Sequence, residues 1–169
     1  MSSPWRDEIR RGLCGDGPAR GVLLGVGNRL RGDDGAGSLL AARLAARGID
    51  RAFDGGTTPE NYCELVAALS PRTVFIADAA CFGGREGEVR LLDPRSLGAG
   101  AFSTHGISLR PLAAYLEERC GCRVVVVGIQ PAAARDGEGV SPAVTGAVAE
   151  LEDCFAGLLG GGAPGGAPA

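Results

Sequence analysis

Three residues in this chain carry side chains that commonly bind metals, and each lies just beyond a predicted strand. His105 is the only histidine. Asp34 belongs to a glycine-rich loop that follows an apolar run, and Asp78 ends another apolar run. Two carboxylates and one imidazole suit Zn, Ni, Mn or Fe and leave coordination positions open, as catalytic and metal-transfer sites do. These residues therefore form a candidate site for a divalent metal.

Each of these residues also has a structural interpretation. Paired acids at the start of a helix, here Asp33 and Asp34, can cap the helix and stabilise its dipole. Asp33 can take that role, which leaves Asp34 to point into the site. An aspartate at a strand end is usually part of a turn, and a lone histidine usually belongs to a loop or the core. The convergence of Asp34, Asp78 and His105 favours the metal site.

Apolar runs alternate with helical patterns along the chain, and this alternation predicts the fold. The predicted strands cover 22–26, 51–54, 72–79, 87–92 and 124–129, and the predicted helices cover 2–14, 36–47, 58–69, 107–119 and 141–159. Such a chain forms an α/β fold, a single three-layer domain with a mostly parallel twisted sheet and helices on both faces. We assign this domain to residues 1–159 and expect residues 160–169, which are only Gly, Ala and Pro, to be a disordered tail.

Polar residues gather where the predicted parallel strands end. They are Asn28 to Asp34 after the first strand, Asp54, Asp78, and Gln130 after the Val-rich strand. Ligands of such sheets bind beyond the carboxyl ends of the strands. We therefore expect these residues to share one edge of the sheet.

Composition excludes several other classes of function. A net charge of −3 and a pI near 5.2 argue against a nucleic-acid surface, which would be basic. No stretch approaches the ~20 apolar residues of a membrane span, and the N-terminus has no apolar signal-peptide core. We expect a cytoplasmic protein, and in that compartment its six cysteines would be reduced thiols. Their spacing gives no CxxC pair.

The first glycine-rich loop offers a nucleotide-binding alternative. Gly25 and Gly27 match the first two glycines of GxGxxG, but Leu30 stands where the third is needed. Asp33 and Asp34 then follow where a pyrophosphate requires a bare helix N-terminus. A nucleotide-binding Rossmann-like domain is therefore the weaker interpretation.

Four motifs together identify a family resemblance. They are Gly25-x-Gly27-Asn28-x-Leu30-x-x-Asp33-Asp34-Gly35-x-Gly37, Asp54-Gly55-Gly56-Thr57, Ile76-Ala77-Asp78-Ala79 and Thr104-His105. Their order and spacing resemble the [NiFe]-hydrogenase maturation proteases from about residue 20 to 158. Thr58-Pro59-Glu60-Asn61 and Val127-Gly128-Ile129-Gln130-Pro131 resemble in particular the branch that processes the large subunit of formate-hydrogenlyase (hydrogenase 3) type enzymes.

The resemblance implies an endopeptidase that removes a C-terminal extension from a hydrogenase large-subunit precursor after nickel has been inserted. It implies that Asp34, Asp78 and His105 bind the substrate's nickel and form the catalytic site. The loop of Asp54, Gly55, Gly56 and Thr57 would contact and select the substrate, with Gly27, Asn28 and Asp33 supporting the metal loop. Some members of the family have glutamate where this chain has Asp34. The aspartate side chain is shorter than glutamate by one methylene.

The resemblance also implies the partners of the chain. Nickel would arrive with the precursor, so no tightly held cofactor is expected, and the protein would act as a monomer without nucleic acid or membrane. A nickel-binding maturation chaperone without peptidase activity would use the same ligands, and the sequence does not separate it from a protease.

Overall fold

The computed structural model describes residues 3–13, 20–98, 102–103, 109–132 and 139–160. Its strands are β1 (Gly21–Val26), β2 (Ala52–Gly56), β3 (Thr73–Cys81), β4 (Val89–Leu92), β5 (Phe102–Ser103) and β6 (Arg123–Ile129). The main sheet has the order β2-β1-β3-β6-β4. β2, β1, β3 and β6 are parallel, β4 pairs antiparallel with β6 at one edge, and β5 pairs antiparallel with the end of β3.

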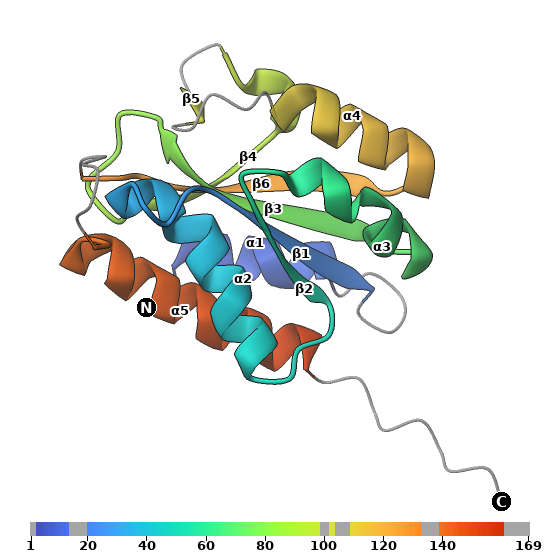
Figure 1. Ribbon diagram of the computed structural model, residues 1–169, viewed down its shortest axis with the longest axis horizontal. Helices are drawn as coiled ribbons and strands as arrows, with labels where there is room; N and C mark the ends of the chain where they lie inside the picture. Colours follow the sequence, from blue (N-terminus) through green and yellow to red (C-terminus); the bar gives the residue numbers. More distant parts are fainter. Residues whose placement is uncertain (1–2, 14–19, 99–101, 104–108, 133–138, 161–169) are drawn as a thin grey trace, which may run out of the picture.

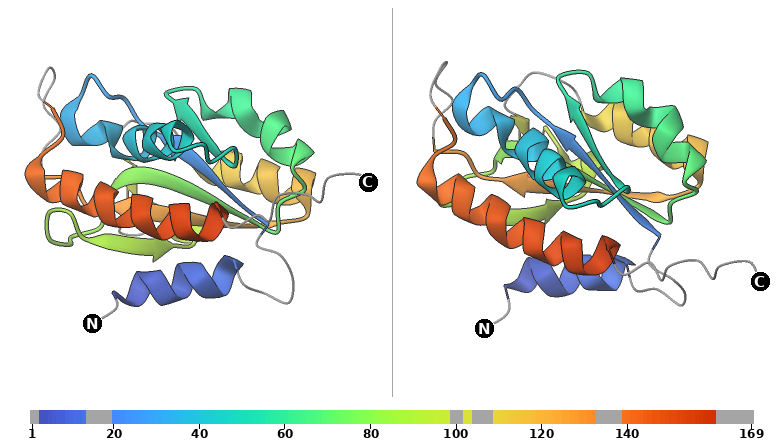
Figure 2. Two further views of the ribbon diagram at one scale, coloured as in Figure 1. Left: turned by 90° about the horizontal axis from the view of Figure 1, so that it is seen from below. Right: turned by 60° about the horizontal axis from the view of Figure 1, so that its bottom comes forward.

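Helices cover both faces of this sheet. They are α1 (Pro4–Leu13), α2 (Ala36–Ala46), α3 (Cys63–Ala68), α4 (Leu109–Cys120) and α5 (Pro142–Leu159), with 3-10 turns η1 (Gly32–Gly35), η2 (Pro59–Tyr62) and η3 (Pro94–Ser96). Figures 1 and 2 show α2 and α5, with α1 beside α5, on one side of the sheet, and α3 and α4 on the other. The predicted three-layer α/β fold with a mostly parallel sheet is confirmed.

Alternation along the central strands builds two separate apolar layers. Leu23 and Phe75 pack with the helices α1, α2 and α5, and the ring of Phe75 meets that of Phe155 edge-on with the centroids 5.3 Å apart. Leu24 and Ile76, one residue later in each strand, pack with α3 and α4. Successive side chains of a strand point to opposite faces. Burying each such side chain contributes about 1.5–3 kcal/mol, so both helical layers are firmly held to the sheet.

Three predicted element boundaries are wrong. β3 does not end at Ala79, as predicted, but continues to Cys81, because β5 pairs with Ala80 and Cys81. β2 continues past Asp54 to Gly56, since Val26 pairs with Gly56 across an irregularity in the ladder. The helix predicted over 58–69 begins instead as the 3-10 turn η2 and becomes α-helical only at Cys63.

The other predicted strands and helices are confirmed to within a few residues. Ser141 caps α5 by accepting a hydrogen bond from the Val144 N–H, and Pro142 occupies the first turn. Residues 161–169 of the predicted disordered tail lie outside the described residues. In the part of the chain that the structure describes, no helix is long and apolar enough to cross a membrane.

Candidate active site

Asp34 is held at the end of β1 by a loop that folds tightly back on itself. The residue lies in η1 and is fully buried, and its Oδ2 accepts a hydrogen bond from the Asn28 N–H at 3.3 Å. Gly27 has a φ of +139° and approaches Asp34 so closely that a Cβ there would overlap the Asp34 carbonyl oxygen. Gly27 and Asn28 therefore fix the backbone that carries this carboxylate.

Asp78 lies in β3, the central strand beside β1, and is fully buried. The strand alternation places its side chain on the same face as Ile76, the face that α3 and α4 cover. β2 lies on one side of β1 and β3 on the other, so the order of strands reverses between β1 and β3. In open α/β sheets, ligand sites form at such a reversal, beyond the carboxyl ends of the strands.

A glycine contact brings the Asp34 loop onto β3. Gly37, in the first turn of α2, meets the backbone carbonyls of Ala77 and Val26 at a distance that leaves no room for a Cβ. η1 itself contacts β3. Because Ala77 directly precedes Asp78, the two buried carboxylates belong to elements in direct contact at one edge of the sheet.

Asp33 does not cap the helix, contrary to the sequence-based expectation. Neither η1 nor α2 has a side-chain cap at its start. The buried Asp33 carboxylate instead accepts hydrogen bonds from the Ala132 N–H at 2.8 Å, the Ser141 N–H at 2.6 Å and the Ser141 hydroxyl at 2.8 Å. It thus ties the loop that carries Asp34 to the end of β6 and the start of α5.

Asp33→Ala is expected to lower the free energy of unfolding by about 3 kcal/mol. The change leaves two partly buried backbone N–H groups and one hydroxyl without their acceptor. Urea denaturation of both proteins measures the difference. The matched control is Asp153→Ala, which removes an exposed ion pair with Arg47 and should cost at most about 0.5 kcal/mol. Equal losses in the two variants would contradict the bracing role of Asp33.

Asp54 lies in β2 within a network that the sequence did not predict. Its Oδ1 accepts hydrogen bonds from the Ser38 hydroxyl at 2.6 Å and the Gly56 N–H at 3.2 Å. Its Oδ2 accepts one from the Arg29 guanidinium at 3.2 Å, and Arg29 also donates to Ser38. Arg29 is the sequence signal that was missed, because a cation inside an acidic loop needs a carboxylate partner.

The remaining residues of the predicted recognition loop follow Asp54. Gly55 is buried against Pro59, Gly56 has a φ of +53°, and Thr57 is exposed. The positive φ turns the chain outward at Gly56, where a side chain would strain the backbone. The Asp54 carboxylate therefore helps to hold this turn, while its side chain stays 36% exposed beside Arg29 and the exposed Thr57.

His105, the third predicted ligand, lies outside the described residues. Among the residues that are described, no group of three or more His, Cys, Asp or Glu side chains has the geometry of a metal site. The described part of the site thus supplies the carboxylates Asp34 and Asp78, and a three-ligand site requires a further group. The role of His105 remains a prediction.

The buried thiols of the chain are poor nucleophiles. Burial raises the pKa of Cys63 and of Cys154. Burial and the neighbouring Cys120 raise the pKa of Cys122 to about 12. Since the thiolate is the reactive form, these three cysteines remain protonated and unreactive at neutral pH.

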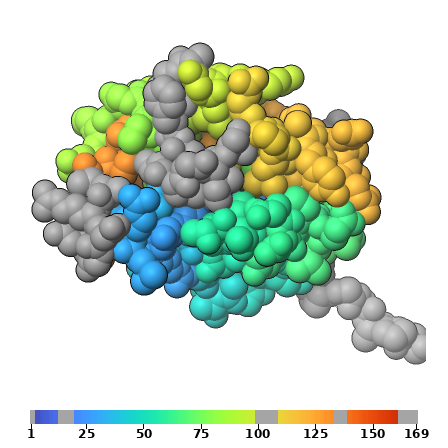
Figure 3. Space-filling model, turned by 45° about the horizontal axis from the view of Figure 1, so that its top comes forward, coloured from blue at the N-terminus to red at the C-terminus, as the bar shows by residue number. Residues whose placement is uncertain are grey.

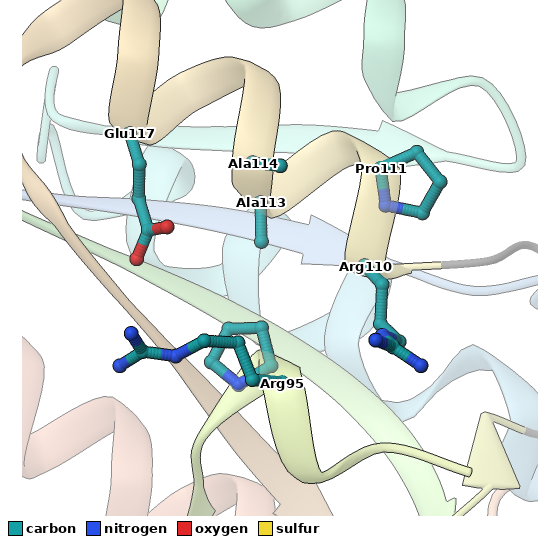
Figure 4. A pocket seen from close by; sticks show the side chains of 7 residues that line it. Arg95, Arg110, Pro111, Ala113, Ala114 and Glu117 are labelled. Atoms are coloured by element: carbon teal, nitrogen blue, oxygen red, sulfur yellow. The ribbon is translucent and has the colours of Figure 1, made fainter.

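Two hollows border α4. One, of about 460 Å³, separates α4 from η3 and is lined by Arg95, Arg110 and Glu117 among others. Figure 4 shows Arg110 and Glu117 extending from α4 towards Arg95 of η3. The other, of about 420 Å³, lies between η2–α3 and α4.

The fold and the two acids define a class of protein. The chain forms a single α/β domain, and two buried carboxylates lie where the order of its parallel strands reverses. Proteins of this class have their ligand sites beyond the carboxyl ends of the strands. The sequence profile described as "HycI: Hydrogenase maturation protease" matches residues 37–156. The chain therefore belongs to the hydrogenase maturation proteases and is a peptide hydrolase.

Individual relatives support this assignment. The chain is 43% identical over 114 residues to the hydrogenase 3 maturation protease of Escherichia coli (strain K12), an alignment that covers 65% of this chain and 72% of the relative. The crystal structure of a [NiFe] hydrogenase maturation protease HycI from Thermococcus kodakarensis KOD1 superposes with a TM-score of 0.75 at 34% identity, covering 94% of this chain and 99% of the other. The solution structure of an endopeptidase HycI from Escherichia coli gives 0.70 at 36% identity, covering 79% and 86%.

Proposed function

We propose that this endopeptidase removes the C-terminal extension of a [NiFe]-hydrogenase large-subunit precursor and recognises the nickel that the precursor carries. The observation that carries the proposal is the pair of buried carboxylates, Asp34 and Asp78, on contacting elements of a hydrogenase maturation protease. Two carboxylates buried on contacting elements would favour the arrival of a cation. A nickel ion bound to the substrate would supply that charge.

In the proposed mechanism, the carboxylates and His105 complete the coordination of the nickel on the precursor. Oxygen and imidazole ligands both suit a divalent transition metal. The nickel would then anchor the tail beside the site and polarise either the scissile carbonyl or a water molecule. Water is the nucleophile that we propose, and the thiols of Cys63, Cys122 and Cys154, whose pKa burial raises, are unsuited to that role.

Selectivity for the loaded precursor follows from this scheme. A precursor without nickel offers no cation to the acidic site, so the buried carboxylates would oppose rather than favour its approach. The loop of Asp54, Gly55, Gly56 and Thr57 is proposed to contact the substrate next to the metal. Arg29 and Ser38 hold Asp54 in place and thereby position that loop.

Cleavage of matched precursors tests the proposal. Purified protein is incubated with nickel-loaded and with nickel-free large-subunit precursor, and the mass of the large subunit is measured by mass spectrometry. We expect a shortened large subunit from the loaded precursor only. Equal cleavage of both precursors would contradict nickel recognition, and nickel transfer without cleavage would support the chaperone alternative.

The isolated protein is expected to hold metal weakly. Two carboxylates and one imidazole leave a coordination sphere incomplete, and the missing ligands would come from the substrate. Enzyme that is treated with a chelator and then freed of it should retain its cleavage rate on nickel-loaded precursor. Metal analysis before and after treatment provides the control. Stoichiometric zinc, with activity lost on chelation and restored by zinc, would instead show a conventional metallopeptidase.

A further inference from the structure

We propose that the groove between η2–α3 and α4 binds a segment of the large-subunit precursor that presents an apolar side chain next to a lysine or arginine. The inference rests on the proposed function, since it concerns how the same substrate is held. We call this surface the η2–α4 groove. It is lined by Pro59, Glu60, Cys63, Glu64, Pro111, Leu112 and Tyr115.

The size and lining of the η2–α4 groove suit an apolar side chain. Its volume of about 420 Å³ is within the range of ~300–1,000 Å³ that is usual for ligand sites. Pro59, Cys63 and Leu112 are buried and form an apolar base, while Tyr115 is 47% exposed at the rim. An exposed aromatic side chain at the rim of an apolar hollow is typical of an interaction site.

The charge of the groove selects a cationic neighbour for that apolar side chain. Glu64 accepts hydrogen bonds from Arg119 and from the Tyr115 hydroxyl, both at 2.9 Å, and the Arg119 guanidinium followed by Tyr115 lowers the pKa of Glu64. Its charge is thus already compensated. Glu60 is exposed, and within the described residues no basic side chain pairs with it. Glu60 therefore supplies the unbalanced negative charge of the groove.

The η2–α4 groove is continuous with the proposed substrate loop. η2 begins two residues after Thr57. Gly55 packs closely against Pro59, since a Cβ added at Gly55 would lie only 3.0 Å from the Pro59 Cα. Asp78 faces the same side of the sheet as α3 and α4. Figure 3 shows the green α3 segment and the yellow-to-orange α4 segment side by side on one face. A precursor anchored at Asp78 can therefore place adjoining residues in the groove.

The hollow on the other side of Pro111 has no such unpaired acid among the described residues. Arg95 and Arg110 line it together with Glu117, and Arg95 is also held by Asp93 through two hydrogen bonds of 3.0 Å. Its acidic side chains therefore face arginines and offer a cationic segment no unbalanced negative charge. The charges around α4 thus favour the side of Glu60 for a cationic segment.

The test is the concentration dependence of cleavage by a charge-reversal variant. Glu60→Arg should raise the KM for nickel-loaded precursor about tenfold and leave kcat within about twofold, because Glu60 is proposed to bind the precursor and is not among the groups proposed to act on the bond that breaks. The difference from wild type should shrink at high salt. The matched control is Asp50→Arg, an equal charge reversal at an exposed position. Asp50 lies two residues before β2, at the amino end of that strand, whereas the groove follows its carboxyl end. Equal KM values for the two variants would overturn the proposal.

A binding measurement separates this inference from the proposed function. A photo-crosslinking benzoylphenylalanine at position 115, aromatic like the tyrosine it replaces, should label the precursor under light. The same residue at position 50 should not. If wild-type protein fails to cleave the precursor, the proposed function falls, and labelling from position 115 still decides the groove. Absence of labelling while the wild type cleaves would overturn the groove alone.

Discussion

Asp78→Asn is expected to abolish processing of nickel-loaded precursor, with a loss of at least about a thousandfold, or ~4 kcal/mol of transition-state stabilisation. The amide has the shape of the carboxylate but carries no charge and is a poor metal ligand. Folding should survive, because a buried carboxylate is itself costly and its neutral isostere is not. Thermal unfolding and cleavage rate, measured on the same preparations, test both halves.

The two measurements distinguish a functional acid from a structural one. A fall in unfolding temperature together with partial activity would show that Asp78 braces the sheet, and would contradict its proposed role. Asp50→Asn, at an exposed position, is the matched control and should change neither quantity. His105→Ala should give the same loss of processing with an intact fold, because His105 is the only imidazole in the chain.

Gly37→Ala should lower the free energy of unfolding by about 3 kcal/mol or more. The added methyl group would overlap the Ala77 and Val26 carbonyl oxygens, which belong to central strands and cannot move aside without breaking the sheet. α2 would have to retreat from β3 and would carry η1 and Asp34 with it. Denaturation midpoints and cleavage rates should therefore fall together.

Gly157→Ala provides a control of opposite sign. This glycine lies in α5 with open space around its Cα, so alanine should stabilise the helix by up to about 1 kcal/mol. The same substitution is thus predicted to destabilise at one helix and stabilise at another. A Gly37→Ala variant as stable as wild type would show that α2 does not need this close approach to the sheet.

Local patterns predicted most of the fold because burial repeats within each element. The Val-rich run of β6 indicates a buried strand, and the spaced leucines of α2 indicate a helix, each within a few residues. The extension of β3 to Cys81 was missed because it depends on β5, which lies far along the chain. A strand of two residues has no periodicity by which a sequence could reveal it.

The site was predictable in part for the same reason. The positions of Asp34 and Asp78 follow from strand order and from the rule that parallel strands end at one edge. Asp33 accepts hydrogen bonds from Ala132 and Ser141, which lie far along the chain. These partners were not predictable, because a contact at that separation produces no recognisable pattern in the residues around Asp33. Helix capping was the best local explanation for Asp33, and a long-range contact replaced it.

The closeness of Gly27 to Asp34 changes how an alanine scan of this protein should be interpreted. Alanine scanning assumes that each substitution removes atoms, so that a loss of activity marks a group that was used. At Gly27, alanine adds an atom where the Asp34 carbonyl already lies, and at a φ of +139°. Such a scan would score Gly27 with the proposed catalytic acids Asp34 and Asp78, although Gly27 would matter only because it has no side chain in the space that the Asp34 carbonyl occupies.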